Sequence, residues 1–155
     1  MNLTPELTPA EYRRMTGAGG SEGVWEARIS SVNPLTVWLC IPGEMPSLNV
    51  TLREHHMVAH RRLQEWTANM QALVVVHKLP RFEKAQMCVV YYFRTNRKRD
   101  EGNYNNFKQL LDAMVKANII ADDNAEVLKL APPEFRVDKQ RPRTEVFVSE
   151  WKGAE

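Results

Sequence analysis

The sequence is poor in cysteine and has no long apolar run, and both features restrict where such a protein works. Its two cysteines, Cys40 and Cys88, each lie inside an apolar β-like stretch. This placement favours small buried side chains over a disulfide or a zinc site, and it predicts a reduced, intracellular setting. The first 20 residues lack an apolar core of signal-peptide length, and no segment approaches a membrane span. We therefore expect a soluble, cytoplasmic protein with no membrane partner.

Several signatures of catalytic loops are absent as well. The seven glycines gather mainly in the first 23 residues, so there is no Walker-type or dinucleotide-binding glycine loop. No G-x-S-x-G nucleophile elbow appears either. His56 and His60 stand one helical turn apart, as zinc ligands do, but Met57 occupies the place of the zincin glutamate. We therefore interpret this pair as exposed polar residues near a phosphate backbone rather than as zinc ligands.

Net charge is small, at +2, but the cations are unevenly distributed. The run RTNRKR, residues 94–99, has four cations and no anion, and RVDKQRPR, residues 136–143, has four cations against one aspartate. Runs of this kind are either solvated loops or surfaces that hold a polyanion. Residue patterns alone leave both interpretations open.

The pattern of apolar residues predicts one domain over residues 24–155, preceded by a flexible N-terminal arm over residues 1–23 with a brief helix at Pro9–Met15. We expect an α+β fold in which two main helices pack on a mixed β-sheet. The expected helices cover Leu52–Lys78 and Tyr104–Ala117. The expected strands are Thr36–Ile41, Lys84–Arg94, Ala125–Leu130 and Thr144–Trp151, with Lys84–Arg94 at the centre because its middle is apolar on both faces.

The first expected helix carries one apolar stripe. Its members recur at steps of four and three, and they are Ala59, Leu63, Trp66, Met70, Leu73 and His77. A stripe of this kind is typical of a core-facing helix, and a dimer seam is the alternative.

Three aspartates lie where the expected elements end. Asp100 follows the central strand and the first basic run, while Asp122 and Asp123 follow the second helix. A strand leading into a helix that packs back on the sheet brings these ends together. Carboxylates are the ligands that Mg²⁺ prefers, and nearby cations would hold a phosphate against the ion. Lys108 adds a cation near the start of the second helix, although with Asp112 it also forms an ordinary i, i+4 ion pair.

A longer pattern connects these residues. The segment Arg97–Leu130 reads RKRDEGNYNNFKQLLDAMVKANIIADDNAEVLKL: a basic run, Asp100 and Asn103, then Lys108 within a helix containing LLDAM, and a closing Asp-Asp. This order resembles the signature of RusA-type Holliday junction resolvases of phage and prophage. IPGEMPSLNVTLREHHMVAHRRLQEW upstream and DKQRPRTEVFV downstream are similar to the turn, first helix and final strand of that family. The resemblance spans about residues 36–151.

The resemblance implies a RusA-like fold and a homodimeric endonuclease that uses Mg²⁺, or alternatively Mn²⁺, to nick four-way DNA junctions symmetrically during recombination and repair inside a bacterial host cell. It implies catalytic roles for Asp100, Lys108 and Asp123, and metal binding by Asp100, Asp123 and Asp122. Contacts to DNA are implied for Arg97, Lys98, Arg99, Asn103, Lys139, Arg141 and Arg143.

The sequence departs from the family at one position. The family motif Asp-x-Asp-Asn reads DEGN here, so Gly102 replaces the second aspartate, and the loop to Lys108 is two residues longer than in the shortest members. Glu101 or Asp122 is then the candidate third carboxylate. Two other functions stay open: a branched-DNA-binding protein with weakened catalysis on the same fold, and a structural or interaction protein whose charged loops are solvated surface.

Overall fold

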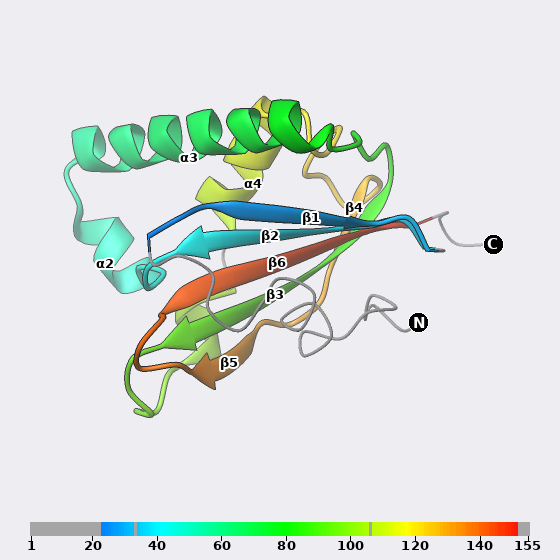
Figure 1. The fold of residues 1–155 in the computed structure, drawn as a ribbon. Helices are drawn as coiled ribbons and strands as arrows, with labels where there is room; N and C mark the ends of the chain where they lie inside the picture. Colours follow the sequence, from blue (N-terminus) through cyan, green and yellow to red (C-terminus); the bar gives the residue numbers. More distant parts are fainter. Residues whose placement is uncertain (1–22, 33, 106, 152–155) are drawn as a thin grey trace.

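The computed structural model describes residues 23–32, 34–105 and 107–151 (Figure 1). The expected arm, apart from residue 23, and the expected helix Pro9–Met15 lie outside these residues. Within them, six strands form one mixed sheet: β1 (Glu26–Ser30), β2 (Thr36–Pro42), β3 (Ala85–Phe93), β4 (Leu128–Leu130), β5 (Glu134–Val137) and β6 (Arg143–Glu150). The α+β class and the mixed sheet are confirmed.

The strand order is β1-β2-β6-β3-β4, and β5 also pairs with β3. The pairs β1–β2, β2–β6 and β6–β3 are antiparallel, whereas β4 and β5 run parallel to β3. Strand β4 pairs with the first residues of β3 and β5 with the last, so β3 has neighbours on both sides along its length. This central position agrees with its nearly continuous burial, as predicted from its apolar sequence.

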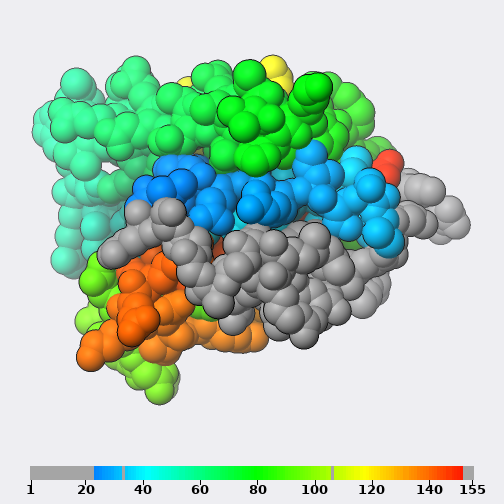
Figure 2. Space-filling view, viewed as in Figure 1, coloured from blue at the N-terminus to red at the C-terminus, as the bar shows by residue number. Residues whose placement is uncertain are grey.

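The helices in the described residues are α2 (Leu48–Arg53), α3 (His56–His77) and α4 (Lys108–Lys116), with the short 3₁₀ turn η1 (Glu101–Asn103) before α4. Helices α3 and α4 contact each other, and α3 also contacts β1. Figure 2 shows the side chains of α3 lying directly against those of β1. At this contact the rings of Trp25 and Trp66 meet edge to face, with centroids 6.5 Å apart, an arrangement worth roughly 0.5–1.5 kcal/mol beyond the area it buries.

The apolar stripe of α3 faces the core, as its spacing indicated. Met70 and Leu73 are buried, and Leu63 and Trp66 pack against the same cluster. From α4 the cluster receives Leu110, Leu111, Ala113 and Met114, and from the sheet it receives alternate residues of β2, β3 and β6. The other face of the sheet carries a second cluster of Trp38, Cys40, Val90, Tyr92 and Phe147. Both cysteines are free thiols, as expected.

The boundaries of the first helical region differ from expectation. The single helix predicted for Leu52–Lys78 is two helices, because Glu54 and His55 adopt extended backbone angles between α2 and α3. Ser47 caps α2 by accepting a hydrogen bond from the backbone N–H of Val50, and His55 caps α3 by accepting one from Met57. The chain therefore changes direction before the long helix begins.

The second helix and three strands also differ from the expectation. Helix α4 begins at Lys108 rather than Tyr104, because Asp100 starts the separate turn η1 first. Strand β4 is shorter than expected, since the Asn124 side chain accepts hydrogen bonds from the N–H groups of Glu126 and Val127 and forms a turn there. Strands β1 and β5 were not predicted. Each is a short strand bearing charged residues, and β5 follows two prolines.

In the described part of the chain, none of the helices has the length and apolarity needed to cross a bilayer.

Candidate functional site

The chain turns back after α4 and returns Asp123 toward the first turns of that helix. Asn118 adopts a left-handed conformation with φ of 63°, and the N–H of Ile119 bonds the carbonyl of Met114, which closes the helix end. Ile120 then forms a parallel bridge with Phe82. The return is close enough for the charge of Asp123 to act on Lys108 at the start of α4.

We call Lys108 together with Asp112 and Asp123 the candidate catalytic corner, and Lys108 is its central residue. Its Nζ lies 3.0 Å from Oδ1 of Asp112, one turn further along α4. The hydrogen bond and charge of Asp112, together with the charge of Asp123, raise the pKa of Lys108. The lysine side chain is 68% exposed and that of Asp112 is 30% exposed. The structure thus presents to solvent an amine that is paired with Asp112 and also feels the charge of Asp123.

Asp100 and Gly102 form the turn that precedes α4. Oδ1 of Asp100 accepts a hydrogen bond from the N–H of Gly102 at 3.0 Å, so this aspartate caps η1 while remaining exposed. Gly102 needs no special backbone angle, and a Cβ placed on it would lie 3.5 Å from Asp100 Oδ1, an ordinary contact. The absence of a carboxylate at position 102 is therefore not imposed by the turn.

Asp122 holds the returning loop. Its Oδ1 accepts a hydrogen bond from the N–H of Asp123 at 2.7 Å, and its Oδ2 accepts one from the Asn124 amide at 3.0 Å. The backbone bond from Asp123, helped by Asn124, lowers the pKa of Asp122. Both oxygens thus already have donors, so Asp123 is the better candidate of the two to face a cation.

The aspartates described above determine whether a divalent ion could be held in this region. Across the ranges that the structure describes, no three His, Cys, Asp or Glu side chains are grouped so that they could hold a metal ion. Mg²⁺ is nonetheless commonly held by one or two carboxylates together with phosphate oxygens and water. Asp100 and Asp123 provide hard oxygen donors on either side of Lys108 in the sequence. Together with a phosphate and water they are the donors that would hold such an ion, and the described residues contain no preformed three-carboxylate site.

The basic run before Asp100 divides into exposed and packed residues. Arg97 and Lys98 are exposed. The guanidinium of Arg99 stacks on the ring of Phe93, with 3.7 Å from its Cζ to the ring centroid, and donates to the backbone carbonyls of Thr95 and Arg97. Arg99 therefore shapes the loop that displays its two neighbours.

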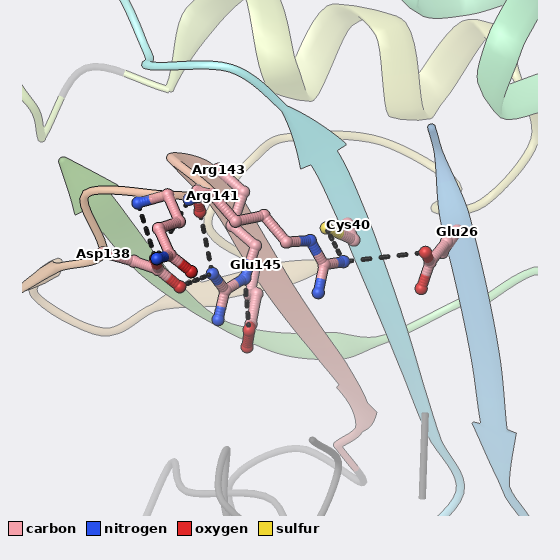
Figure 3. Close-up of polar contacts among 7 residues, drawn as sticks. Glu26, Cys40, Asp138, Arg141, Arg143 and Glu145 are labelled. Carbon is pink, nitrogen blue, oxygen red and sulfur yellow. Dashed lines mark hydrogen bonds and ion pairs between the residues drawn. The ribbon is translucent and has the colours of Figure 1, made fainter. Parts of the chain in front are cut away.

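The second basic run is largely internal. Arg143 is 3% exposed, and it donates to Asp138 at 2.7 Å and to the fully buried Glu145 at 3.3 Å (Figure 3). Arg141 lies in the same group, 3.6 Å from Glu26 and 3.8 Å from the sulfur of Cys40. Burial alone would raise the pKa of Asp138, but the hydrogen bonds from Arg143 and from the Arg141 N–H outweigh it and lower that pKa.

The residues expected to contact DNA therefore occupy two regions. Arg97, Lys98 and Asn103 adjoin the Asp100 turn. Arg141 and Arg143 pair with carboxylates of β1, of β6 and of the loop that follows β5. Their burial favours a structural role in this conformation. Lys139 is exposed on the loop between β5 and β6.

A pocket opens beside Lys108, between α2, α3 and the start of α4. Its apolar lining is Met45, Pro46, Leu48, Trp66, Tyr91, Tyr104, Phe107 and Leu110, and its polar lining is Thr51, Asn103, Lys108 and Gln109. The hydroxyl of Tyr91 donates to the carbonyl of Tyr104 at 2.8 Å, which fixes the backbone at its floor. Lys108 therefore belongs both to the candidate catalytic corner and to the lining of this pocket.

The sequence patterns missed three features of this region. Asp112 was interpreted as an ordinary surface partner of Lys108, although the same i, i+4 spacing is what places it at the corner. Arg136 of β5 lines a hollow together with Arg97 and Arg99, which its place in a presumed loop did not indicate. The pocket has no sequence signature, because its lining comes from five separate segments.

No protein-family model matches the chain, and no curated protein matches it closely enough to be a relative.

Proposed function

We propose that this protein is a metal-dependent endonuclease of the RusA type that cleaves four-way DNA junctions or related branched DNA. The proposal rests on the sequence resemblance, and one structural observation supports it best. Lys108 pairs with Asp112 at the start of α4, and the charge of Asp123, fifteen residues further along the chain, also acts on Lys108. An exposed cation paired with a carboxylate and preceded in sequence by a basic loop is an arrangement suited to phosphodiester hydrolysis.

In the proposed reaction each residue has a distinct task. Asp100 and Asp123 hold the divalent ion, which is Mg²⁺ with Mn²⁺ as an alternative. When bound, the ion polarises the phosphate and lowers the pKa of an attacking water. Lys108 stabilises the negative charge that develops on the phosphate oxygens, and its own raised pKa keeps it protonated for this task. Asp122 supports Asp123 by fixing the loop that carries it.

Binding of DNA is assigned to exposed cations of the two basic runs. Arg97, Lys98 and Lys139 are free of the buried ion-pair group and exposed to solvent, and Arg136 adds a fourth cation beside Arg97. Such residues position the phosphate backbone without reading its sequence. A junction has approximate two-fold symmetry, so two matched nicks require two copies of the chain, and we include a homodimer acting inside the bacterial host cell in the proposal.

The experiment that tests this function is cleavage of an end-labelled four-way junction, with Mg²⁺, Mn²⁺ and EDTA compared in parallel. We expect paired, symmetric nicks in both metals and none in EDTA, with a linear duplex of the same sequence left intact. Cleavage of the duplex at an equal rate would contradict the structural selectivity, and nicking that persists in EDTA would contradict the metal dependence.

A second function is favoured by one observation. Gly102 removes a carboxylate from the turn, and the described residues contain no ready group of three metal ligands. A branched-DNA-binding protein with weakened catalysis on the same fold would show this combination. Such a protein would bind the junction and slow its migration in a gel in every lane, with or without metal. It would leave the junction uncut. Equal affinity for junction and duplex at physiological salt would instead favour the third candidate, an interaction protein with solvated charged loops.

A further inference from the structure

The pocket beside Lys108 has the composition of a binding site for an aromatic ring. Trp66, Tyr104 and Phe107 contribute ring surfaces from α3 and from the segment before α4, and Met45 and Leu48 add flexible apolar contact. Flat aromatic walls with a few polar groups at the margin are typical of sites that take heteroaromatic ligands. At this margin the polar groups are the amide of Asn103 and the amine of Lys108.

Hydrogen bonds brace the walls of the pocket against collapse. Arg62 of α3 pairs with Glu54, between α2 and α3, through two bonds of 2.9 and 2.5 Å, and it also donates to Gln109 of α4 at 3.1 Å. The Gln109 amide nitrogen in turn donates to the carbonyl of Ala59 at 2.9 Å. These bonds connect the three helices around the opening, so the pocket exists before a ligand arrives and little ordering is needed on binding.

The size of the pocket restricts its ligand. The cavity measures about 70 Å³. One water needs roughly 10–15 Å³ on this scale, so the cavity replaces about five waters, the bulk of one six-membered ring. A helix or strand of a partner protein is too large for this space, whereas the face of one planar base is not.

The position of the pocket identifies where such a base comes from. Lys108 lies in the pocket wall and also carries the positive charge of the proposed catalytic corner. A DNA strand whose phosphate is held at Lys108 has its neighbouring sugar and base within reach of the pocket. In a duplex that base is stacked and paired, but at the crossover of a junction stacking is interrupted and extrusion costs less.

We propose that this pocket receives one nucleobase unstacked from the crossover of a branched DNA, and so contributes to selectivity for junctions over duplex. This inference rests on the proposed function. Stacking between the base and the aromatic walls supplies the affinity, and the sugar–phosphate backbone stays outside with Lys108. Since stacking uses the face of the base, the pocket needs no particular sequence.

The test measures binding of the full chain in EDTA, where the proposed reaction does not proceed. The DNA is an intact four-way junction or the same junction with one base removed, either at each position flanking the crossover or, as a control, in the middle of an arm. Two variants fill the pocket, Thr51→Trp and Leu48→Trp. The matched control is Leu52→Trp on the same helix, because Leu52 is 74% exposed and does not line the pocket.

We expect removal of one crossover base to weaken binding by wild-type protein about tenfold or more, the loss typical of one base–aromatic stack. Removal of an arm base should have no comparable effect. Thr51→Trp and Leu48→Trp should weaken binding of the intact junction to the same extent and should then be insensitive to the missing base, while Leu52→Trp behaves as wild type. This non-additivity places the base and the filled space at one site.

Four results overturn the inference. If wild type prefers junction to duplex but ignores every missing crossover base, the pocket is not a base site and the proposed function stands. If the filled variants keep a full response to the missing base, the base binds elsewhere. If the filled variants lose a dimer seen by sedimentation while keeping that response, the pocket is a subunit contact. Equal affinity of wild type for junction and duplex overturns the proposed function together with the inference.

Discussion

Lys108 and Asp112 face each other across one turn of α4, with 3.0 Å between Nζ and Oδ1. The pair is mostly exposed, and exposed pairs of this spacing contribute little to folding. The effect of this ion pair is therefore local. Asp112 restrains the long, rotatable side chain of Lys108 and raises the pKa of its amine, and the charge of Asp123 adds to this increase. The pair thus places a restrained cation at the solvent-exposed start of α4.

Lys108 should be needed for cleavage and Asp112 for its placement. We expect Lys108→Met to lower kcat about 100-fold, the loss typical of one group that stabilises transition-state charge. Asp112→Ala should cost roughly tenfold, because the amine loses its acceptor. Asp112→Asn, which keeps an oxygen for the hydrogen bond, should recover most of that loss. Single-turnover rates on a labelled junction measure these effects, and unchanged urea midpoints show that the fold is intact. Equal rates for Asp112→Ala and wild type would exclude the positioning role.

The two adjacent aspartates after α4 should behave differently. Asp123→Asn removes a proposed metal ligand, so we expect cleavage to fall at least about 100-fold while junction binding in EDTA is kept. Asp122→Asn removes the same charge one residue away but retains an oxygen that can accept from the Asp123 N–H, and its loss should be under about tenfold. The Mg²⁺ dependence of the rate separates the two variants. A greater loss for Asp122→Asn would reverse the assignment.

Periodicity predicted the elements that are buried on a regular face. The stripe of α3 and the apolar run of β3 repeat at helical and strand spacings, and both lie where those spacings placed them. Strand β5 has no buried residue, and its charged, half-exposed sequence resembles a loop. The break between α2 and α3 depends on caps at Ser47 and His55, and apolar spacing does not report caps.

The site was predictable to the extent that it is local in sequence. The spacing of Lys108 and Asp112 placed them on one helix face. The approach of Asp123 depends on the left-handed turn at Asn118 and the bridge of Ile120 to Phe82, which are tertiary features. Arg143 and Glu145 alternate on a strand and share a face, but only the assembled sheet decides that this face is buried. A run of cations therefore suggested DNA contact where part of it forms internal ion pairs.

Arg143 should contribute to stability. Removing one partner of a buried ion pair typically costs about 3–5 kcal/mol, so Arg143→Met should lower the free energy of unfolding by about that amount. Arg136→Met on β5 is the control. Its side chain is 52% exposed and its ion pair with Glu134 spans 3.7 Å, so we expect a change below about 0.5 kcal/mol. Urea unfolding measures both. A stable Arg143→Met protein that binds junctions weakly would identify Arg143 as a DNA contact instead.

Both cysteines should be unreactive in the folded protein. Burial raises the pKa of Cys40 to about 12 and that of Cys88 to about 11, so at pH 8 the thiolate of Cys88 is about one part in a thousand. An aromatic disulfide reagent should therefore react slowly with native protein, first at Cys88, and rapidly with two thiols in denaturant. Because the unfolded thiols ionise near 9.0, the unfolded state binds fewer protons above that pH, and stability should fall as pH rises further. One fast thiol in native protein would contradict this burial.

Gly102 offers a gain-of-function test of the proposed metal site. A side chain at this position meets Asp100 Oδ1 only at an ordinary 3.5 Å from Cβ, so Gly102→Asp should fold normally and place a second carboxylate beside Asp100. The added ligand should lower the Mg²⁺ concentration needed for half-maximal cleavage, roughly tenfold if it coordinates the ion. Gly102→Ala, which fills the same space without charge, should require as much Mg²⁺ as wild type. If both variants respond alike, the effect is one of turn stiffness and the ion is not bound beside Asp100. If Gly102→Asp alone responds, Asp100 and position 102 share the ion, and the glycine of the natural sequence explains weaker binding of metal at this turn.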